Sequence, residues 1–324
     1  MRVDSYISLS LWLSSLSLND SHTHFKPLNN YLHQNLTMSV RISTLKVEGI
    51  EAFYRSSGNP SSPVLLLLHG FPTSSHQFRN LIPLLAEQYY VLAPDFPGFG
   101  FTVVPDDLDY NYTFANLAKF IGSFLDALSI TKFAVYIFDY GAPTALRLAL
   151  ERPEAVTAII SQNGNAYVEG LGDFWNPIKA YWASDSKEDR DVLRNTILTF
   201  EATEWQYKNG NPNPEAVPPE TYYLDYALME RPGNKEIQLD LFRDYGSNVP
   251  LYPKFQEYFR NSGVPVLAVW GKGDEIFVPP GAEAFKRDVK KLNVHLLDAP
   301  HFAIETRERV FAELILGFLK KNGI

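Results

Sequence analysis

Short apolar runs alternate with amphipathic segments along most of the chain. Residues 44–54 alternate apolar and polar positions and predict a β-hairpin that turns near Glu48-Gly49. Residues 64–68 form a continuous apolar run, as expected for a strand buried on both faces of a parallel sheet. Further strands are predicted at residues 90–93, 133–138, 264–270 and 293–297.

Helical patterns separate these predicted strands. Residues 113–128 and about 305–320 predict amphipathic helices, and residues 144–150 continue a third. Another helix is predicted to start at Thr73 or Ser74 as its N-cap, with an apolar face that includes Phe78, Leu81, Leu84 and Leu85. This alternation predicts an α/β fold with a mostly parallel central sheet flanked by helices.

Residues 1–37 differ from the rest because they are rich in Ser, Asn, His and Leu. The apolar segment at residues 7–18 is broken by serines, Asp4 is unfavourable in a signal's charged region, and no small-x-small cleavage site follows. We expect residues 1–37 to be a disordered extension and the protein to be cytoplasmic. Secretion through a weak N-terminal signal is the alternative.

Composition narrows the class of protein. A chain of 324 residues with 45% hydrophobic and 14% aromatic residues fits one large core with an insertion, or two domains. The net charge of -8 argues against a nucleic-acid partner, and no apolar run reaches transmembrane length. The absence of Cys excludes disulfides, thiolate metal sites and a Cys nucleophile. The oligomeric state is left open.

The run at 133–138 ends abruptly in Asp139, and Gly141 and a helical pattern follow. A sharp strand-to-helix turn is a context that presents a nucleophile. An Asp with an ordinary pKa near ~3.9 is an anion at neutral pH. It can displace a leaving group from saturated carbon and leave an ester, which indicates opening of an epoxide or displacement of a halide. The alternative is an Asp that caps the following helix.

Further motifs accompany Asp139. They are His69-Gly70-Phe71-Pro72, Asp95-Phe96-Pro97-Gly98-Phe99-Gly100, Gly271-Lys272-Gly273-Asp274 and Asp298-Ala299-Pro300-His301. Together they resemble the α/β-hydrolase fold family, in its epoxide hydrolase and haloalkane dehalogenase branch. The resemblance covers roughly residues 45–320, and the order nucleophile, acid, histidine is the order this fold uses.

The resemblance implies a role for each of these residues. Asp139 would be the nucleophile, His301 the base that activates water, and Asp274 the acid that orients the imidazole. The alternative for Asp274 is a simple turn residue, but the loop at residues 162–165, where some dehalogenases carry the acid, holds no carboxylate. By analogy, the backbone N–H groups of Phe71 and Tyr140 would form the oxyanion hole.

Aromatic residues and prolines are dense between residue 164 and about residue 255. We expect a helical cap at 164–255, inserted into an α/β-hydrolase core at 38–163 and 256–324. The family's epoxide hydrolases use cap tyrosines to donate a proton to the epoxide oxygen. Tyr181 is our first choice for this role and Tyr245 the second; the other candidates are Tyr207, Tyr222, Tyr223, Tyr226 and Tyr252.

The family's dehalogenases bind the halide through an Asn or Trp N–H near the His-Gly-x-Pro turn and a Trp after the nucleophile. Phe71 and Tyr140 stand at those places here, although Trp175 or Trp182 could supply a donor. Phe71 matches epoxide hydrolases, whereas Phe138 and Tyr140 depart from their usual residues. We therefore predict a hydrolase without cofactor or metal that forms an alkyl-enzyme ester.

We expect its substrates to be water and a small hydrophobic epoxide. A haloalkane dehalogenase is the runner-up, and a non-catalytic ligand-binding relative of the fold is a third possibility.

Overall fold

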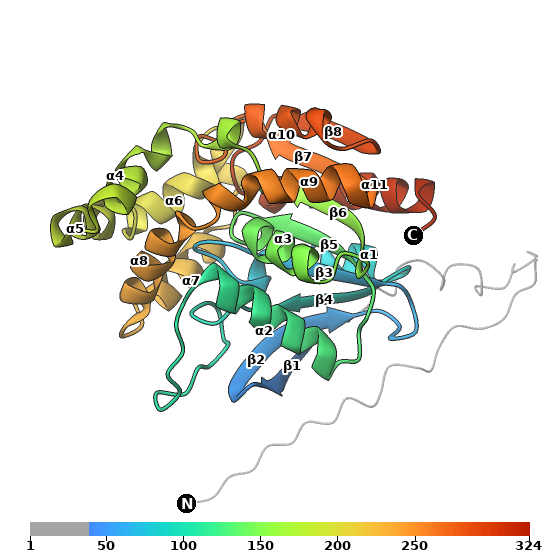
Figure 1. Ribbon diagram of the computed structural model, residues 1–324, viewed down its shortest axis with the longest axis horizontal. Helices are drawn as coiled ribbons and strands as arrows, with labels where there is room; N and C mark the ends of the chain where they lie inside the picture. The colour runs from blue at the N-terminus through green and yellow to red at the C-terminus, as the bar shows by residue number, and fades with distance from the viewer. Residues whose placement is uncertain (1–38) are drawn as a thin grey trace, which may run out of the picture. The chain divides into compact units, whose positions relative to one another are not determined.

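The computed structural model describes residues 39–324, which form one eight-stranded sheet with helices on both faces (Figure 1). The strand order is β1-β2-β4-β3-β5-β6-β7-β8. The strands are β1 (Arg41–Val47), β2 (Ile50–Ser57), β3 (Val64–Leu68), β4 (Tyr90–Pro94), β5 (Phe133–Phe138), β6 (Val156–Gln162), β7 (Val266–Gly271) and β8 (Leu292–Leu297).

The sheet is parallel from β3 to β8, as predicted. Only β2 runs antiparallel to its neighbours, β1 and β4. The predicted hairpin is confirmed: β1 and β2 are joined by Glu48 and Gly49, both with positive φ (48° and 92°). Two residues with positive φ give the tight turn whose twist matches that of the paired strands.

The sheet is flanked by α1 (Ile82–Leu85), α2 (Phe114–Ala127), α3 (Gly141–Glu151), α9 (Tyr252–Ser262), α10 (Pro280–Ala284) and α11 (Ile304–Lys321), with the 3-10 turns η2 (Ser75–Phe78) and η7 (Phe285–Arg287). Ser74 is an N-cap as predicted, and its hydroxyl accepts from the His76 N–H. The expected single helix is instead split into η2 and α1, because Pro83 starts a new helix.

Alternate residues of each central strand serve opposite faces of the sheet. Leu66 and Leu68 of β3 join the apolar cluster that contains α2, α3 and α9. Leu65 and Leu67 join the cluster that contains α1 and α11. Burial on both faces explains why the central strands read as unbroken apolar runs rather than as alternating patterns.

The segment between β6 and β7 is helical, and we call residues 168–251 the helical insertion. It comprises η3 (Val168–Gly170), η4 (Asp173–Trp175), α4 (Asn176–Ser184), α5 (Lys187–Thr196), α6 (Phe200–Lys208), η5 (Pro214–Ala216), α7 (Pro219–Met229), α8 (Asn234–Tyr245) and η6 (Val249–Leu251). In Figure 1, α4 to α8 gather at one side of the sheet.

The predicted division between cap and core stays a prediction. Its boundary at residue 255 falls inside α9, whose residues pack against α3 on one face of the sheet. The expected extension at residues 1–37, with its weak secretory signal, lies outside the described residues. In residues 39–324, no helix is both long enough and apolar enough to cross a membrane.

An aromatic stack fixes the insertion to a loop of the sheet, and a buried hydrogen bond joins two of the insertion's helices. The Tyr207 ring of α6 stacks on Phe302, with 3.7 Å between ring centroids. Its hydroxyl donates to the buried carboxyl of Asp225 on α7. Burial, together with the charge of Glu305, raises the pKa of Asp225 to about 7, although hydrogen bonds from Tyr207 and Thr73 act in the opposite direction.

Because the pKa of Asp225 is higher in the folded protein than in the unfolded chain, the folded protein binds more protons between these two values. Stability should therefore fall as the pH rises toward and through about 7. This contribution is complete below the unfolded pKa near 3.8 and is lost through the folded value. Asp225→Asn should flatten the slope of unfolding free energy against pH, by up to about 1.4 kcal/mol per pH unit. Urea unfolding from pH 5 to 8 measures this; equal slopes for both proteins would contradict it.

Candidate active site

Asp139 stands in a tight turn between β5 and α3. Its φ is +47°, a left-handed conformation that is uncommon for residues other than glycine, and its side chain is 4% exposed. A Cβ on Gly141 would lie 2.5 Å from the carbonyl oxygen of Leu68, so only glycine allows this close packing. Asp139 does not cap α3, whose N-cap residue is Tyr140. The capping alternative is therefore wrong.

The turn after β3 lies directly against the Asp139 carboxylate. The Phe71 backbone N–H donates to Asp139 Oδ1 at 2.6 Å, and the Tyr140 backbone N–H also hydrogen-bonds this carboxylate. A Cβ on Gly70 would come within 2.2 Å of the same Oδ1, so this approach also requires glycine. The two backbone donors predicted from the sequence are thus both brought to Asp139.

His69 holds this turn against the loop after β4. Its Nε2 accepts from the Phe96 backbone N–H at 3.0 Å, and its Nδ1 lies 3.1 Å from the carbonyl oxygen of Gly70. Burial lowers the pKa of His69 to about 3, so the ring is neutral at pH 7. His69 therefore connects two of the motifs that carried the family resemblance.

Asp274 and His301 form a buried pair beyond the ends of β7 and β8. His301 Nδ1 lies 2.8 Å from Asp274 Oδ2. The other Asp274 oxygen accepts from the backbone N–H groups of Ile276 (2.7 Å) and Phe277 (3.1 Å). Because its carboxylate is held by backbone donors, Asp274 can orient the His301 ring.

Asn163 completes the support of this pair, and the sequence argument missed it. Its side-chain amide donates to Asp274 Oδ2 and its Oδ1 accepts from the Gly271 N–H at 3.2 Å. The residue has a φ of +49° at the end of β6. Its place in the loop at residues 162–165 could have indicated this role, but only a carboxylate was considered at that position.

Burial and charge set the titration of the site. Burial raises the pKa of Asp139 to about 6, while the charge of His301 and the two backbone N–H groups lower it. Burial lowers the pKa of His301, but the charge and hydrogen bond of Asp274 and the charge of Asp139 leave it raised overall. Among residues 39–324, His301 Nε2 has no hydrogen-bond partner. One ring nitrogen is therefore held and the other is available.

Tyr245 packs against the residue that follows Asp139. Its buried ring packs against those of Tyr140 (5.9 Å) and Trp175 (4.4 Å), and its hydroxyl lies 3.2 Å from that of Tyr252. Burial, Tyr252 and then the charge of Asp139 raise the pKa of Tyr245 well above its ordinary value. Through Tyr140, Tyr245 is therefore connected to the turn that carries Asp139.

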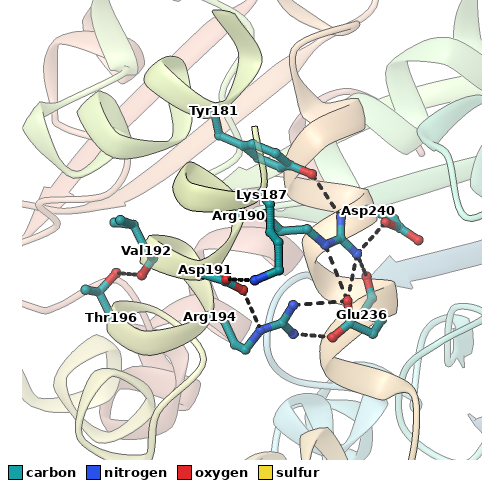
Figure 2. A network of polar contacts seen from close by, with 9 residues as sticks. All are labelled: Tyr181, Lys187, Arg190, Asp191, Val192, Arg194, Thr196, Glu236 and Asp240. Carbon is teal, nitrogen blue, oxygen red and sulfur yellow. Dashed lines mark hydrogen bonds and ion pairs between the residues drawn. The ribbon is translucent and has the colours of Figure 1, made fainter. Parts of the chain in front are cut away.

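Tyr181 has a different environment. Its hydroxyl accepts from Arg190 at 2.9 Å, and Arg190 also binds Glu236 and Asp240 of α8 (Figure 2). No described contact joins it to Asp139, so Tyr181 is the weaker of our two choices. Of the other candidates, Tyr207 donates to Asp225 and Tyr223 is 59% exposed.

The two tryptophans proposed as halide donors already use their ring N–H groups. Trp175 donates to the carbonyl oxygen of Ile276 at 2.9 Å, and Trp182 donates to that of Phe242 at 2.7 Å. Each tryptophan would have to break its own hydrogen bond before it could bind an anion. In the described part of the chain, no group of three or more His, Asp or Glu side chains could hold a metal ion.

Comparison with known proteins identifies the family of this chain. Residues 63–308 match the family model of the alpha/beta hydrolase fold. An uncharacterized hydrolase of Saccharomyces cerevisiae is 49% identical over 279 residues, which cover 85% of this chain and 95% of that protein. Epoxide hydrolase 3 of Mus musculus is 24% identical over 306 residues (89% and 79%).

A haloalkane dehalogenase of Bradyrhizobium diazoefficiens is 34% identical over 122 residues, or 38% of each chain. Among solved structures, the epoxide hydrolase CorEH has a TM-score of 0.70 at 18% identity, over 87% of this chain and 99% of that one. The chain belongs to the α/β-hydrolase fold family and is a hydrolase. The predicted fold class and the prediction of an enzyme are confirmed.

The contact at Gly70 can be tested without an activity assay. Gly70→Ala should lower the free energy of unfolding by about 1–3 kcal/mol, because the new methyl group has no space beside Asp139. Gly317→Ala is the matched control, since a Cβ there meets nothing within 4 Å in an exposed part of α11, and it should stabilise by up to about 1 kcal/mol. Urea unfolding of both variants decides; equal effects would contradict the predicted clash.

Proposed function

We propose that this protein is an epoxide hydrolase that needs no cofactor and acts on small hydrophobic epoxides. The observation that carries the proposal is a buried Asp139 carboxylate that accepts from two backbone N–H groups and is charge-coupled to the His301–Asp274 pair. An anionic nucleophile suits attack on saturated carbon rather than lasting acyl transfer.

In the first step, the Asp139 oxygen that is not held by Phe71 attacks an epoxide carbon. The new C–O ester bond forms as the epoxide C–O bond breaks, and the electron pair moves to the epoxide oxygen. That oxygen takes a proton from a tyrosine hydroxyl. Here Tyr245 is preferred to Tyr181, because its ring packs on Tyr140, the residue that follows Asp139, and its buried hydroxyl keeps its proton until an alkoxide develops; Tyr181 is the second candidate.

In the second step, water attacks the ester carbonyl of Asp139. His301 Nε2 takes the water's proton, and Phe71 and Tyr140 N–H groups bind the oxyanion that develops on Oδ1. Alkylation removes the Asp139 charge that helps to raise the pKa of His301, so it lowers this pKa and favours the neutral ring that acts as a base.

Collapse of this intermediate returns the His301 proton to the leaving diol oxygen. The remaining proton on Asp139 returns to the tyrosinate. The net reaction consumes one epoxide and one water and releases one diol.

Dehalogenation is the alternative, and the partial similarity to a haloalkane dehalogenase keeps it in the test. It is less favoured because a departing halide needs N–H donors, and those of Trp175 and Trp182 are bound to backbone carbonyl groups. An alkoxide, in contrast, needs a proton, which a tyrosine can give.

His301→Ala should stop ester hydrolysis while leaving Asp139 able to react. Intact-mass spectrometry after incubation with styrene oxide should show an adduct equal to the whole epoxide, located on Asp139 by peptide mapping. His295→Ala, which changes a partly buried His of β8, should turn over without accumulating adduct. An adduct of a haloalkane's alkyl group, with none from epoxides, would favour dehalogenation; normal turnover by His301→Ala would refute the mechanism.

The pH dependence tests the nucleophile separately. Only ionised Asp139 can attack, so kcat/KM for styrene oxide should fall as the pH drops through about 6. An ordinary exposed Asp would hold activity down to about pH 4. An acid limb near 4, measured by initial rates in one buffer series at constant ionic strength, would contradict the effect of burial on Asp139.

A further inference from the structure

Asp139 is closed off from solvent, so a substrate needs a route to it. One large cleft, of about 880 Å³, opens on the surface, and Trp182 is among the residues that line it. Its walls are the loop at residues 111–116, the ends of α4 and α8, and Gly246 and Ser247. It therefore runs between the helical insertion and a loop of the sheet.

Trp182 forms part of this cleft and is connected through Tyr245 to the residue that follows the nucleophile. Its half-buried ring stacks on Tyr245, with 6.1 Å between centroids and 7° between planes. Tyr245 in turn packs on Tyr140, which follows Asp139 in the chain. The rings of Trp182 and Tyr245 therefore lie between the cleft and Tyr140.

The position of Trp182 is fixed from two directions. Its N–H is bonded to the carbonyl oxygen of Phe242, whose ring packs on Phe71 at 5.0 Å. On the cleft side, a Cβ on Gly246 would lie only 3.1 Å from the Trp182 ring. Glycine at 246 therefore leaves the space that the indole occupies.

The charges around the cleft are mostly paired with one another. Arg243 binds Asp185, and Arg190 binds Asp240 and the Tyr181 hydroxyl. These two arginines therefore present no unpaired positive charge to an anionic substrate. The inner end of the route is aromatic, which suits an uncharged substrate that carries an apolar group.

We propose that this cleft is the entrance for substrate and that the Trp182 indole closes its inner end, so that Trp182 limits the bulk of the epoxide that reaches Asp139. The proposal rests on the proposed function. A competing route is the crevice lined by Phe71, Leu228 and Met229, which holds only about 10 Å³. Of the two, only the cleft has room for a molecule of the size of a substrate.

The test measures alkylation alone, in proteins that carry His301→Ala so that the ester accumulates. The rate of adduct formation is followed by intact mass with styrene oxide and with the bulkier trans-stilbene oxide. Adding Trp182→Ala should raise the ratio of the stilbene oxide rate to the styrene oxide rate by about tenfold or more. Met229→Ala is the matched control on the competing route and should leave the ratio unchanged.

Two further measurements separate gating from damage. Trp182→Phe retains a flat ring without the N–H and should keep a ratio close to that of the parent, which assigns the effect to ring bulk rather than to the bond with Phe242. Thermal unfolding of each variant shows that it is folded at the assay temperature. An unfolded Trp182→Ala protein would be replaced by Trp182→Leu, for which the same rise in the ratio is expected.

The proposal is overturned if Met229→Ala raises the ratio and Trp182→Ala does not, or if neither does. It is also overturned if Trp182→Phe raises the ratio as much as Trp182→Ala. A His301→Ala parent that forms no adduct even with styrene oxide would instead refute the epoxide hydrolase function itself, and the two failures are thereby distinguished.

Discussion

The burial of one carboxylate, that of Asp139, is the constraint on which the rest of the site depends. Removing a carboxylate from water costs several kcal/mol unless hydrogen bonds and opposite charge replace the lost hydration. Here the replacements come from the Phe71 and Tyr140 N–H groups and from His301. Strands β3, β5, β6, β7 and β8 lie side by side in this order in the sheet, so the loops that carry these groups are adjacent.

Residues that follow these strands consequently meet at one edge of the sheet. Phe71 lies beyond β3, Asp139 beyond β5, Asn163 beyond β6, Asp274 beyond β7 and His301 beyond β8. Three of the four neighbouring pairs are hydrogen-bonded: Phe71 binds Asp139, Asn163 binds Asp274, and Asp274 binds His301. A crevice at the carboxyl ends of parallel strands is the usual place for a site in such a sheet.

How much of this was predictable from sequence depends on whether the cause is local. Strand β5 and the Asp139 turn were predicted because an unbroken apolar run followed by Gly141 is a local signal. The partners of Tyr181, Trp175 and Trp182 were not, because they depend on how helices of the insertion pack on one another and on the sheet. Asn163 was missed for a related reason, since a neutral amide becomes informative only when its buried partner, Asp274, is known.

Because Asp139 is buried, part of the molecule must move before a substrate can reach its carboxylate. Opening the whole helical insertion would break the Tyr207–Phe302 stack and the hydrogen bonds that Arg231 and Gln238 donate to the carbonyl oxygens of Gly100 and Gly98. The ion pairs that join α5 to α8, seen in Figure 2, would resist any separation of those two helices. Rotation of the Trp182 indole disturbs one hydrogen bond and two ring contacts, with Tyr245 and Trp175. Side-chain motion at Trp182 therefore costs fewer contacts than domain opening.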